Sequence, residues 1–517
     1  MELPLLTRAW QGDDAFHLTT EIDSTETLTA TLAGALCGTA NAARLPREPG
    51  PGEQYRFHFD MTKCIGCKCC VVACNEQNGN PADILWRRVG EIEGGAYPQT
   101  HRHYLSMGCN HCLEPTCLTG CPVDAYSKDS LTGIVLHSAS ACIGCQYCTW
   151  NCSYGVPQFN PERGVVGKCD MCYGRLTNGQ EPACAAACPE DAITIEVVET
   201  AVWREQFRAS ANSPGMPSAD DSLSTTRITL PAKRPADLQK VDLRNLRPEH
   251  PHWALVVMTV LTQLSVGAFT SIWLLQVFGA QVHRSAAIVA LLVAFLALSA
   301  STLHLGRPIY AMRALKMWRR SWLSREVLLF TAFSFAASIY AGTLWLGLGE
   351  AGIFGACTAI LGLCGVSASA RLYLVPGRPA WNSPFTIAEF LCTAAVFGAS
   401  GAMILTHGAP GTTTPFLCAA SATLLIAGAK TVRCAYSSIH ELRGTWQLLT
   451  TVFQTHFFFR CLMLVAGILL LAVMDETWGR LSIAAVTLAG EFLSRYLFFV
   501  TVVPTNMATG YLAQEAG

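Results

Sequence analysis

The sequence predicts an α+β cysteine-rich domain followed by an all-α bundle of eight membrane-spanning helices, and three observations support this fold class. Of the 517 residues, 51% are hydrophobic and only 14% are charged, which is too apolar for an ordinary soluble protein. The polar first half, residues 1–250, holds 18 of the 24 cysteines. From Trp253 onward, apolar runs approach the roughly twenty residues that a helix needs to cross the hydrocarbon core of a membrane.

Changes in composition divide the chain into four segments. Residues 1–54 form an N-terminal arm of scattered polar and small residues, and residues 55–200 form the cysteine-rich domain, with short hydrophobic stretches such as 193–198 that we expect to be strands. Residues 201–251 are rich in Ser, Pro, Asp and Ala, a composition typical of a linker or an extended segment. Residues 252–517 form the membrane bundle.

The positive charges between the apolar runs predict the orientation of the bundle. The runs are 253–279, 285–304, 326–348, 352–370, 385–406, 414–436, 458–474 and 481–503. The connections 305–325, 371–384 and 430–457 contain eleven Lys and Arg residues, whereas the alternate connections contain only Arg284 and Arg480. Short loops rich in Lys and Arg stay in the cytoplasm, and the N-terminus reads as neither a signal peptide nor a twin-arginine signal. We therefore expect a prokaryotic cytoplasmic (inner) membrane protein whose cysteine-rich domain and termini face the cytoplasm.

Sixteen cysteines fall into four motifs with related spacing. The motifs are Cys64, Cys67, Cys70, Cys74; Cys109, Cys112, Cys117, Cys121; Cys142, Cys145, Cys148, Cys152; and Cys169, Cys172, Cys184, Cys188. The first and third motifs have the spacing C-x2-C-x2-C-x3-C, and the second and fourth end in C-x3-C-P. The sequence thus presents two related pairs of motifs.

This spacing indicates iron–sulfur clusters in a ferredoxin-like polycluster domain. Three thiolates on one tight loop can bind three irons of a cubane, and the fourth cysteine reaches a second cluster, as in two-cluster ferredoxins. Gly66 and Gly144 suit the tight turns of such loops. Zinc accepts C-x2-C pairs but does not call for the offset fourth cysteine, and a reducing compartment disfavours disulfides. Sixteen thiolates therefore predict four [4Fe–4S] clusters, with Cys69 a surplus, small buried residue and Cys37 unassigned.

The cysteine-rich domain resembles the electron-transfer subunit of molybdopterin oxidoreductases of the dimethyl-sulfoxide-reductase type. The likeness covers about residues 55–198 and is carried by the four motifs, with MGCNHCLEPTCLTGCPVDAY at 107–126 and CIGCQYCTWNCSYGVPQFNPERGVVGKCDMC at 142–172. It implies crosswise sharing of ligands between paired motifs. The four implied ligand sets, here numbered in order, are Cys64, Cys67, Cys70, Cys188; Cys169, Cys172, Cys184, Cys74; Cys109, Cys112, Cys117, Cys152; and Cys142, Cys145, Cys148, Cys121.

The membrane half is similar to the eight-helix anchor of the same enzymes, so the chain looks like a fusion of two subunits that are separate in most relatives. The stretches that carry this likeness are HWALVVMTVLTQLSVGAF at 252–269, HLGRPIYAMRALKMWRRSWLSRE at 304–326, RLYLVPGRPAWNS at 371–383 and GEFLSRYLFF at 490–499. In the resembling anchor the histidine equivalent to His304 belongs to the quinol site.

Ionisable side chains in or beside the spans are the candidate quinone-site residues, because such groups are costly in a membrane. His304 suits proton transfer near neutral pH, although it could simply cap a helix. Glu491 and Arg495, four residues apart on one face of the last span, could line the quinone pocket or a proton route, or form a structural ion pair. Candidate contacts with the cofactor are Arg307, Glu326, Arg371 and Tyr373; the last three lie at cytoplasmic span ends and could instead be interface anchors.

The remaining membrane residues argue against other cofactors. The histidines at 252, 304, 407, 440 and 456 lie at span ends or in connections without a facing pair, so we expect no haem. The six cysteines beyond residue 350 lack ligand spacing and are interpreted as small apolar helix residues. No nucleotide-binding glycine motif or nucleic-acid-binding stripe is present in the sequence.

The resemblance implies electron transfer between a membrane quinone, menaquinone or ubiquinone, and a separate catalytic subunit with molybdenum on two pyranopterin guanine dinucleotides. Cytoplasmic orientation favours oxidation of sulfite or formate over reduction of S- or N-oxides as the partner's reaction. A redox-driven ion-translocating module is an alternative, which predicts buried carboxylates in several spans. A non-catalytic assembly or redox-sensing protein is another, which predicts clusters that exchange no electrons with quinone.

Overall fold

The computed structural model describes residues 45–209, 222–233, 235, 237–241, 246–348, 351–409, 411–473 and 477–505. The chain divides into two compact units, Met1–Arg44 and Leu45–Gly517. All described residues belong to the second unit. Most of the expected N-terminal arm, with Cys37, and parts of the expected linker lie outside the described residues.

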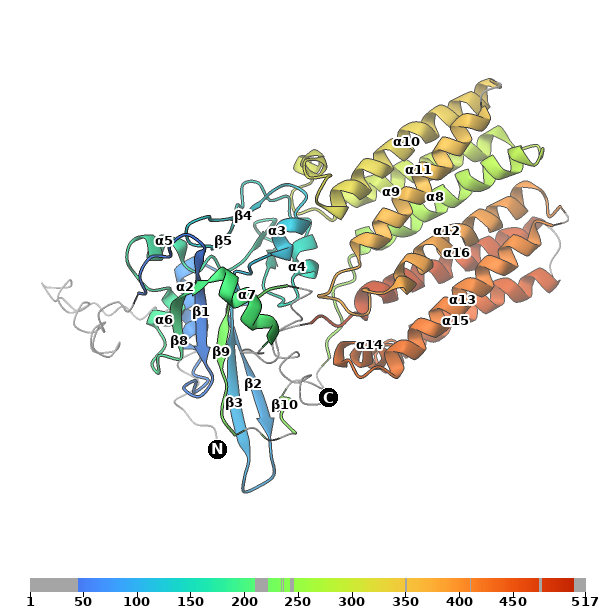
Figure 1. Cartoon of the computed structure of the whole chain (residues 1–517). Coiled ribbons are helices and arrows are strands. Elements are labelled where there is room, and N and C mark those ends of the chain that lie inside the picture. Colours follow the sequence, from blue (N-terminus) through green and yellow to red (C-terminus); the bar gives the residue numbers. More distant parts are fainter. Residues whose placement is uncertain are drawn as a thin grey trace, which may run out of the picture. The chain divides into compact units, whose positions relative to one another are not determined.

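The cysteine-rich domain is built on two small sheets and two hairpins (Figure 1). In the first sheet β1 (Glu53–Asp60) pairs antiparallel with β8 (Ile193–Glu199) and parallel with β9 (Arg227–Thr229), so the expected strand at 193–198 is confirmed. In the second sheet, β2 (Arg88–Gly94) lies between β3 (His101–Met107) and β10 (Gln239–Lys240). The hairpins are β4 (Tyr126–Lys128) with β5 (Val135–His137) and β6 (Gln158–Asn160) with β7 (Val165–Gly167).

Short helices lie between these strands. They are α2 (Cys69–Asn78), α3 (Thr116–Gly120), α4 (Tyr147–Asn151), α5 (Tyr173–Thr177) and α6 (Ala183–Ala186), and α7 (Thr200–Ala209) follows β8. Of these helices, α2, α3, α4 and α6 each contain at least one motif cysteine. The first and third motifs have the same backbone turn: Gly66 and Gly144 have φ of 73° and 70°, and Lys68 and Gln146, which precede α2 and α4, have φ of 63° and 60°. Positive φ is where glycine is favoured. The matching sequence spacing therefore corresponds to matching loop geometry.

Within the described residues, eight helices are long and apolar enough to span a membrane. They are α8 (Trp253–Val277), α9 (Arg284–Leu303), α10 (Trp322–Leu346), α11 (Ala351–Leu372), α12 (Pro384–Leu405), α13 (Thr413–Ala435), α15 (Gln454–Val473) and α16 (Thr477–Val500). The 3-10 helix η1 (Pro308–Leu315) precedes α10, and α14 (His440–Thr450) lies between α13 and α15. The fold class expected from the sequence, an α+β domain followed by an eight-helix bundle, is confirmed.

The structure corrects the assignment of residues 430–457 to a connection. Lys430 and Arg433 lie inside α13, and α14 occupies much of the remaining stretch. The side chain of Lys430 forms an ion pair with Glu389 of α12 at 2.6 Å. A charge that is paired inside the bundle is not evidence for a loop. Lys430 and Arg433 should therefore not be counted among the positive charges of this connection.

Helix α8 holds the bundle together, because it packs against α9, α11, α12 and α16. The approach of α8 to α12 depends on Gly267, where an added Cβ would overlap the carbonyl oxygen of Ala394. Small residues at such contacts let two helix backbones come close in a membrane. In Figure 1, α8 to α11 are coloured green to yellow, and α12, α13, α15 and α16 run alongside one another in orange and red.

The cysteine-rich domain contacts the start of the connection between α9 and α10. The amide of Gly306 donates to the carbonyl of Gly144 at 3.3 Å, and the amide of Arg307 donates to Ile143 at 3.1 Å. A Cβ on Gly306 would overlap the backbone of Gly164. The third cysteine motif therefore lies directly against the membrane half, and only a glycine fits between them.

Candidate functional site

The thiols of the first and fourth motifs lie together in two groups. Burial raises the pKa of the Cys64 thiol, and the neighbouring thiols raise it further; these are Cys70, Cys188 and Cys67. Burial likewise raises the pKa of Cys74, whose thiol neighbours are Cys169, Cys184 and Cys172. The structure therefore places Cys188 beside three cysteines of the first motif, and Cys74 beside three of the fourth.

The second and third motifs exchange their last cysteines in the same way. Burial raises the pKa of Cys117, and the thiols that add to this effect are Cys152, Cys109 and Cys112. Burial raises the pKa of Cys145 to about 12, with contributions from Cys121 and Cys142. The pKa of Cys148 is raised in the same manner, first by burial and then by Cys145 and Cys142. These neighbourhoods include the partners of the crosswise ligand sets that the family resemblance implies, together with some thiols of an adjacent set, such as Cys117 beside Cys148.

Backbone amides point at several of these sulfurs. Within the third and fourth motifs, Gly144 and Met171 donate to the sulfurs of Cys142 and Cys169, each at 3.4 Å. Four residues after each Cys-Pro cysteine, the amides of Ala125 and Ala192 donate to Cys121 and Cys188 at 3.3 and 3.2 Å. Such bonds favour thiolate over thiol, and hydrogen bonds to the sulfurs are one determinant of cluster potential.

Two buried cations face the thiols, and this is the charge arrangement that an anionic cluster requires. Arg87 is only 3% exposed; burial alone would lower its pKa, but the thiols of its neighbourhood raise it, and these are Cys184, Cys169, Cys70 and Cys74. Lys168 is equally buried, and its pKa is raised, against burial, by Cys109, Cys117 and Cys169 together with Asp170. A buried charge is costly unless it is compensated, so the residues present fit iron–sulfur clusters bearing negative charge.

The spacing of the side chains also fits clusters better than single ions. Within the described residues, no group of three or more His, Cys, Asp or Glu could hold one metal ion. The thiolates of a cubane each bind a different iron, and they therefore stand farther apart than the ligands of one ion. No disulfide joins the described cysteines, which are all free.

Cys69 is exposed, and its interpretation as a small buried residue is wrong. It is the first residue of α2, whereas its neighbour Cys70 is buried. Because consecutive residues of a helix point in different directions, only one of the two can face the interior. Cys69 remains outside the four sets.

A cavity of about 1010 Å³ lies between the third cysteine motif and the membrane helices. The cysteine-rich domain contributes Cys145, Tyr147 and Trp150, and the membrane half contributes His304, Glu326 and Tyr373 among mostly apolar residues. Glu326 and Tyr373 are buried. A large apolar cavity with a few converging polar groups is the usual form of a small-molecule site.

The hydrogen bonds of His304 define which ring nitrogen is available. Its Nδ1 lies within hydrogen-bond distance of the carbonyl oxygen of Ser301, and since a carbonyl can only accept, Nδ1 carries the proton. Burial lowers the pKa of His304 to about 4, so the ring is neutral near pH 7. Its Nε2 is therefore a free acceptor in a residue that lines the cavity.

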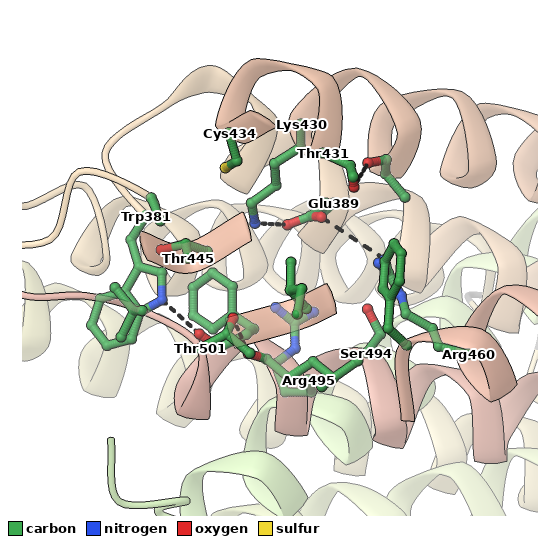
Figure 2. A pocket seen from close by; sticks show the side chains of 17 residues that line it. Trp381, Glu389, Lys430, Thr431, Cys434, Thr445, Arg460, Ser494, Arg495 and Thr501 are labelled. Carbon is green, nitrogen blue, oxygen red and sulfur yellow. Dashed lines mark hydrogen bonds and ion pairs between the residues drawn. The ribbon is translucent and has the colours of Figure 1, made fainter. Parts of the chain in front are cut away.

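Of the other candidate residues, Arg307, Arg371 and Glu491 do not line this cavity. Arg307 donates to the carbonyl of Ala139 at 2.8 Å, and the Arg371 guanidinium lies 5.7 Å from the centre of the Trp322 ring. Neither Glu491 nor Arg495 lines the first cavity. Arg495 instead lines a second cavity of about 610 Å³ (Figure 2).

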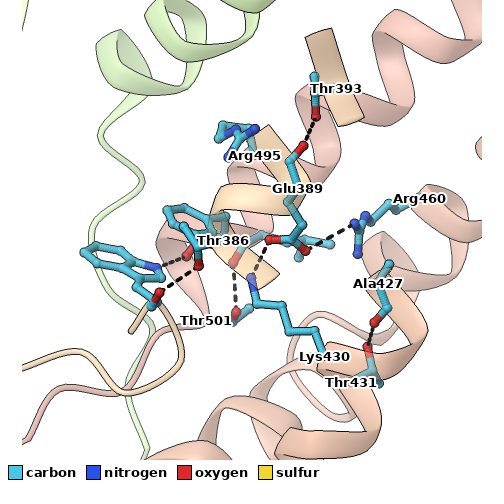
Figure 3. Close-up of polar contacts among 12 residues, drawn as sticks. Thr386, Glu389, Thr393, Ala427, Lys430, Thr431, Arg460, Arg495 and Thr501 are labelled. Carbon is cyan, nitrogen blue, oxygen red and sulfur yellow. Dashed lines mark hydrogen bonds and ion pairs between the residues drawn. The ribbon is translucent and has the colours of Figure 1, made fainter. Parts of the chain in front are cut away.

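Several residues of this region could not be singled out from the sequence. Tyr147 and Trp150 sit in an ordinary stretch between cysteines, and only the fold turns them toward the membrane half, where the Trp150 ring lies 5.4 Å from Trp381. By contrast, charged residues inside apolar spans can be recognised in the sequence as candidates for a polar site. Arg460 and Glu389 are examples, and both belong to one polar cluster (Figure 3).

The thiol sets, the cavity beside them and the apolar helices define a membrane-anchored iron–sulfur electron-transfer protein. Residues 100–198 match the family model described as a 4Fe-4S dicluster domain, and residues 248–500 match that of the DMSO reductase anchor subunit. One relative, a component of the anaerobic dimethyl sulfoxide reductase of Haemophilus influenzae, is 36% identical over 177 residues, which are 32% of this chain and 85% of that protein. The component of the same name from Escherichia coli is 38% identical over 154 residues, 28% of this chain and 75% of the other.

A third relative is a component of the sulfite dehydrogenase of Allochromatium vinosum, 34% identical over 160 residues, which are 27% of this chain and 67% of that protein. This protein belongs to the family of dimethyl sulfoxide reductase iron–sulfur subunits, and its iron–sulfur part is fused to the anchor subunit. It is thus a component of an oxidoreductase complex that combines electron transfer through iron–sulfur clusters with anchoring in a membrane.

Proposed function

We propose that the chain passes electrons between a membrane quinone and a separate molybdopterin bis-guanine-dinucleotide subunit through four [4Fe–4S] clusters. The four crosswise ligand sets defined above would hold the clusters. The neighbourhoods of Cys64, Cys74, Cys117 and Cys145 support this assignment. When bound, the clusters accept and release one electron each, and the protein holds them in fixed positions.

The observation that carries the quinone proposal is the lining of the first cavity. One side chain of the fourth ligand set, Cys145, lines the same cavity as His304 and Glu326. A quinol bound there would have a cluster ligand and two proton-accepting groups as neighbours. Quinol oxidation releases two electrons and two protons, so these are the neighbours that the reaction needs.

In this reaction His304 would accept a proton from a quinol hydroxyl. The Ser301 carbonyl fixes the ring with Nδ1 protonated, which leaves the Nε2 lone pair for the hydroxyl. Glu326 is the second candidate acceptor, and the buried Tyr373 would orient the ring of the quinol. In quinone reduction the same groups would deliver protons instead. Menaquinone and ubiquinone both fit this description.

The catalytic partner and its orientation are part of the same proposal. Among the relatives are proteins named for dimethyl sulfoxide reductase, sulfite dehydrogenase and formate dehydrogenase. The excess of Lys and Arg on one side of the bundle supports a cluster domain in the cytoplasm. We therefore favour oxidation of sulfite or formate by a cytoplasmic partner over reduction of S- or N-oxides.

The test is a redox titration of the membrane-bound protein monitored by electron paramagnetic resonance (EPR), with and without quinol and a quinol-site inhibitor. We expect four reducible clusters that exchange electrons with quinol or quinone in the wild type, and at least a tenfold slower exchange in His304→Ala, on the scale of one lost acid–base group of order 10²-fold. The matched control is His456→Ala, which removes an exposed histidine of α15 and should leave the rate unchanged. Four clusters that are neither reduced by quinol nor oxidised by quinone in the wild type would refute the quinone proposal.

A second candidate function, a redox-driven ion-translocating module, is favoured by one observation. Glu389 and Glu491, on different spans, are both buried or nearly so, and the Thr393 hydroxyl lies within hydrogen-bond distance of the Glu389 backbone and the Glu491 side chain. Two buried carboxylates, linked only through the Glu389 backbone, are too few for a route across the membrane.

A further inference from the structure

Five charged side chains gather in the C-terminal half of the bundle, away from the thiols. Glu389 comes from α12, Lys430 from α13, Arg460 from α15, and Glu491 and Arg495 from α16. All except Glu491 line the second cavity, and Figure 2 shows Glu389, Lys430, Arg460 and Arg495 around it. Ionisable residues within membrane spans are costly and mark functional sites by default.

Glu389 has the partners of an ionised carboxylate. Its Oε2 lies 2.6 Å from Lys430 Nζ, and its Oε1 lies 3.9 Å from a guanidinium nitrogen of Arg460, as Figure 3 shows. Two cations compensate one negative charge at this position. Glu389 can therefore remain an ionised carboxylate inside the bundle.

Glu491 has different surroundings. No ion pair joins it to another described residue, and its Oε1 is buried without a hydrogen-bond partner. Arg495, four residues later on the same helix, donates instead to Gln263 at 3.1 Å and lies 3.7 Å from the centre of the Phe390 ring. An ionised carboxylate here would have no cation at ion-pair distance among the described residues, and the positive charges of Arg460 and Arg495 would act on it only from farther away.

The hydroxyl of Thr393 lies between two oxygen atoms but has one hydrogen to donate. Its Oγ1 lies 2.9 Å from the backbone carbonyl oxygen of Glu389 and 2.7 Å from Oε2 of Glu491. The hydroxyl has one hydrogen, and the carbonyl can only accept. If Thr393 donates to the carbonyl, as Thr commonly does one turn back in a helix, the second bond must be donated by Glu491.

We propose that Glu491 is a protonated carboxylic acid and that it exchanges its proton with water through the second cavity. This is a proton-binding site separate from the quinone cavity, and it does not depend on the proposed quinone reaction. On losing its proton, Glu491 would become a carboxylate that faces the cations of α15 and α16. The titratable and charged groups around it are Arg495 on its own helix and Glu389, Cys392, Lys430 and Arg460 on the neighbouring helices.

The cavity offers a connection to water. Beyond Glu389 and Lys430 it is lined by Thr445 of α14 and by Thr501, which directly follows α16. Water is plausible in a polar cavity that has room for it, and this one has about 50 Å³ of space for the centres of water molecules. Thr393 contacts both Glu491 and the backbone of Glu389, and the side chains of Glu389 and Arg495 line the cavity.

Infrared spectroscopy of the complete protein in membranes tests both parts of the proposal. A protonated carboxylic acid has a carbonyl stretching band that shifts when the proton is replaced by deuterium. We expect Glu491→Gln to remove one such band. The matched control Glu389→Gln should keep the band, and Thr393→Val should move it without removing it, because the acid remains but loses its hydrogen-bond acceptor.

The outcomes are decisive in each direction. A band that survives Glu491→Gln, or that Glu389→Gln also removes, overturns the assignment of the proton to Glu491. A band that is insensitive to D2O overturns the exchange through the cavity. The readout is taken without quinol and without turnover. A failure of the quinone proposal would appear in the EPR experiment and leave these spectra unchanged, so the two failures are distinguishable.

Discussion

Replacing Arg87 with Gln should lower the reduction potential of the clusters beside it. The guanidinium is buried, its Nη1 lies 3.0 Å from Ser106 Oγ, and that hydroxyl lies 3.5 Å from the sulfur of Cys70. Reduction adds a negative charge to a cluster, and a nearby positive charge stabilises the reduced form. Removing the cation therefore makes reduction harder.

The magnitude follows from Coulomb's law. With about 7 Å between the guanidinium and a cluster and an effective dielectric constant of about 20, the interaction is about 2.4 kcal/mol. For a one-electron couple this corresponds to about 100 mV. We expect the largest fall at the second ligand set, because three of the four thiols that face Arg87 belong to it, and the remaining one, Cys70, belongs to the first set.

The assay is an EPR redox titration of wild type, Arg87→Gln and Arg87→Lys. The lysine variant keeps the charge and should recover most of the potential. Arg88→Gln is the matched control, because this neighbouring arginine faces Cys152 of the third set and should shift a different cluster. A shift below about 20 mV in Arg87→Gln, or an equal shift of every cluster, would refute the electrostatic reasoning.

Three further predictions follow from other parts of the molecule. Gly306→Val should keep all clusters in the EPR spectrum but slow their electron exchange with quinol on the order of tenfold. The valine side chain would displace Gly164 at the contact with the membrane half. An unchanged rate would show that this contact is not needed for electron transfer. Cys188→Ser should lower the iron content by disturbing one ligand set, whereas Cys69→Ser, at an exposed thiol, should leave it unchanged, and equal losses would contradict the ligand assignment. Burial would raise the pKa of Glu196, but hydrogen bonds from His58 and Arg227 and the charge of Arg56 lower it overall. At pH values above the usual carboxyl pKa, Glu196→Gln should therefore lower the free energy of unfolding by about 2 kcal/mol. The difference in melting temperature between the variant and the wild type should vanish as the pH falls through the native pKa of Glu196.

The fold class could be predicted because both halves leave strong local signals. Cysteine spacing predicts the conformation of the loop that holds each motif. In the structure, Gly66 and Gly144 have similar positive φ values at equivalent positions of the first and third motifs. Apolar length reports a span, and the eight expected runs correspond to the eight helices. The start of α10 at Trp322, four residues before the expected position, reflects Arg325 and Glu326 within its first turns, since a charged pair masks the apolar pattern.

The site was less accessible to sequence reasoning, because its residues come from distant segments. His304 and Glu326 stood out as ionisable groups near spans, but nothing local indicates that Cys145 and Tyr147 line the same cavity. Glu491 and Arg495 were paired on helical spacing alone. Their helix does place them on one face, yet Arg495 reaches across to Gln263 of α8 and Glu491 to Thr393 of α12, choices that depend on packing between helices.

The hydrogen bonds between residues 143–144 and 306–307 have a consequence for assembly. When an electron-transfer subunit and its anchor are separate chains, their interface must overcome the loss of freedom on association. Here the two halves are covalently linked, and docking is governed by an effective concentration set by the connecting segment. The contact therefore does not have to hold the two halves together. Its role can be limited to positioning the third cysteine motif relative to the membrane half. A variant at this junction should therefore remain assembled at any protein concentration while it transfers electrons poorly.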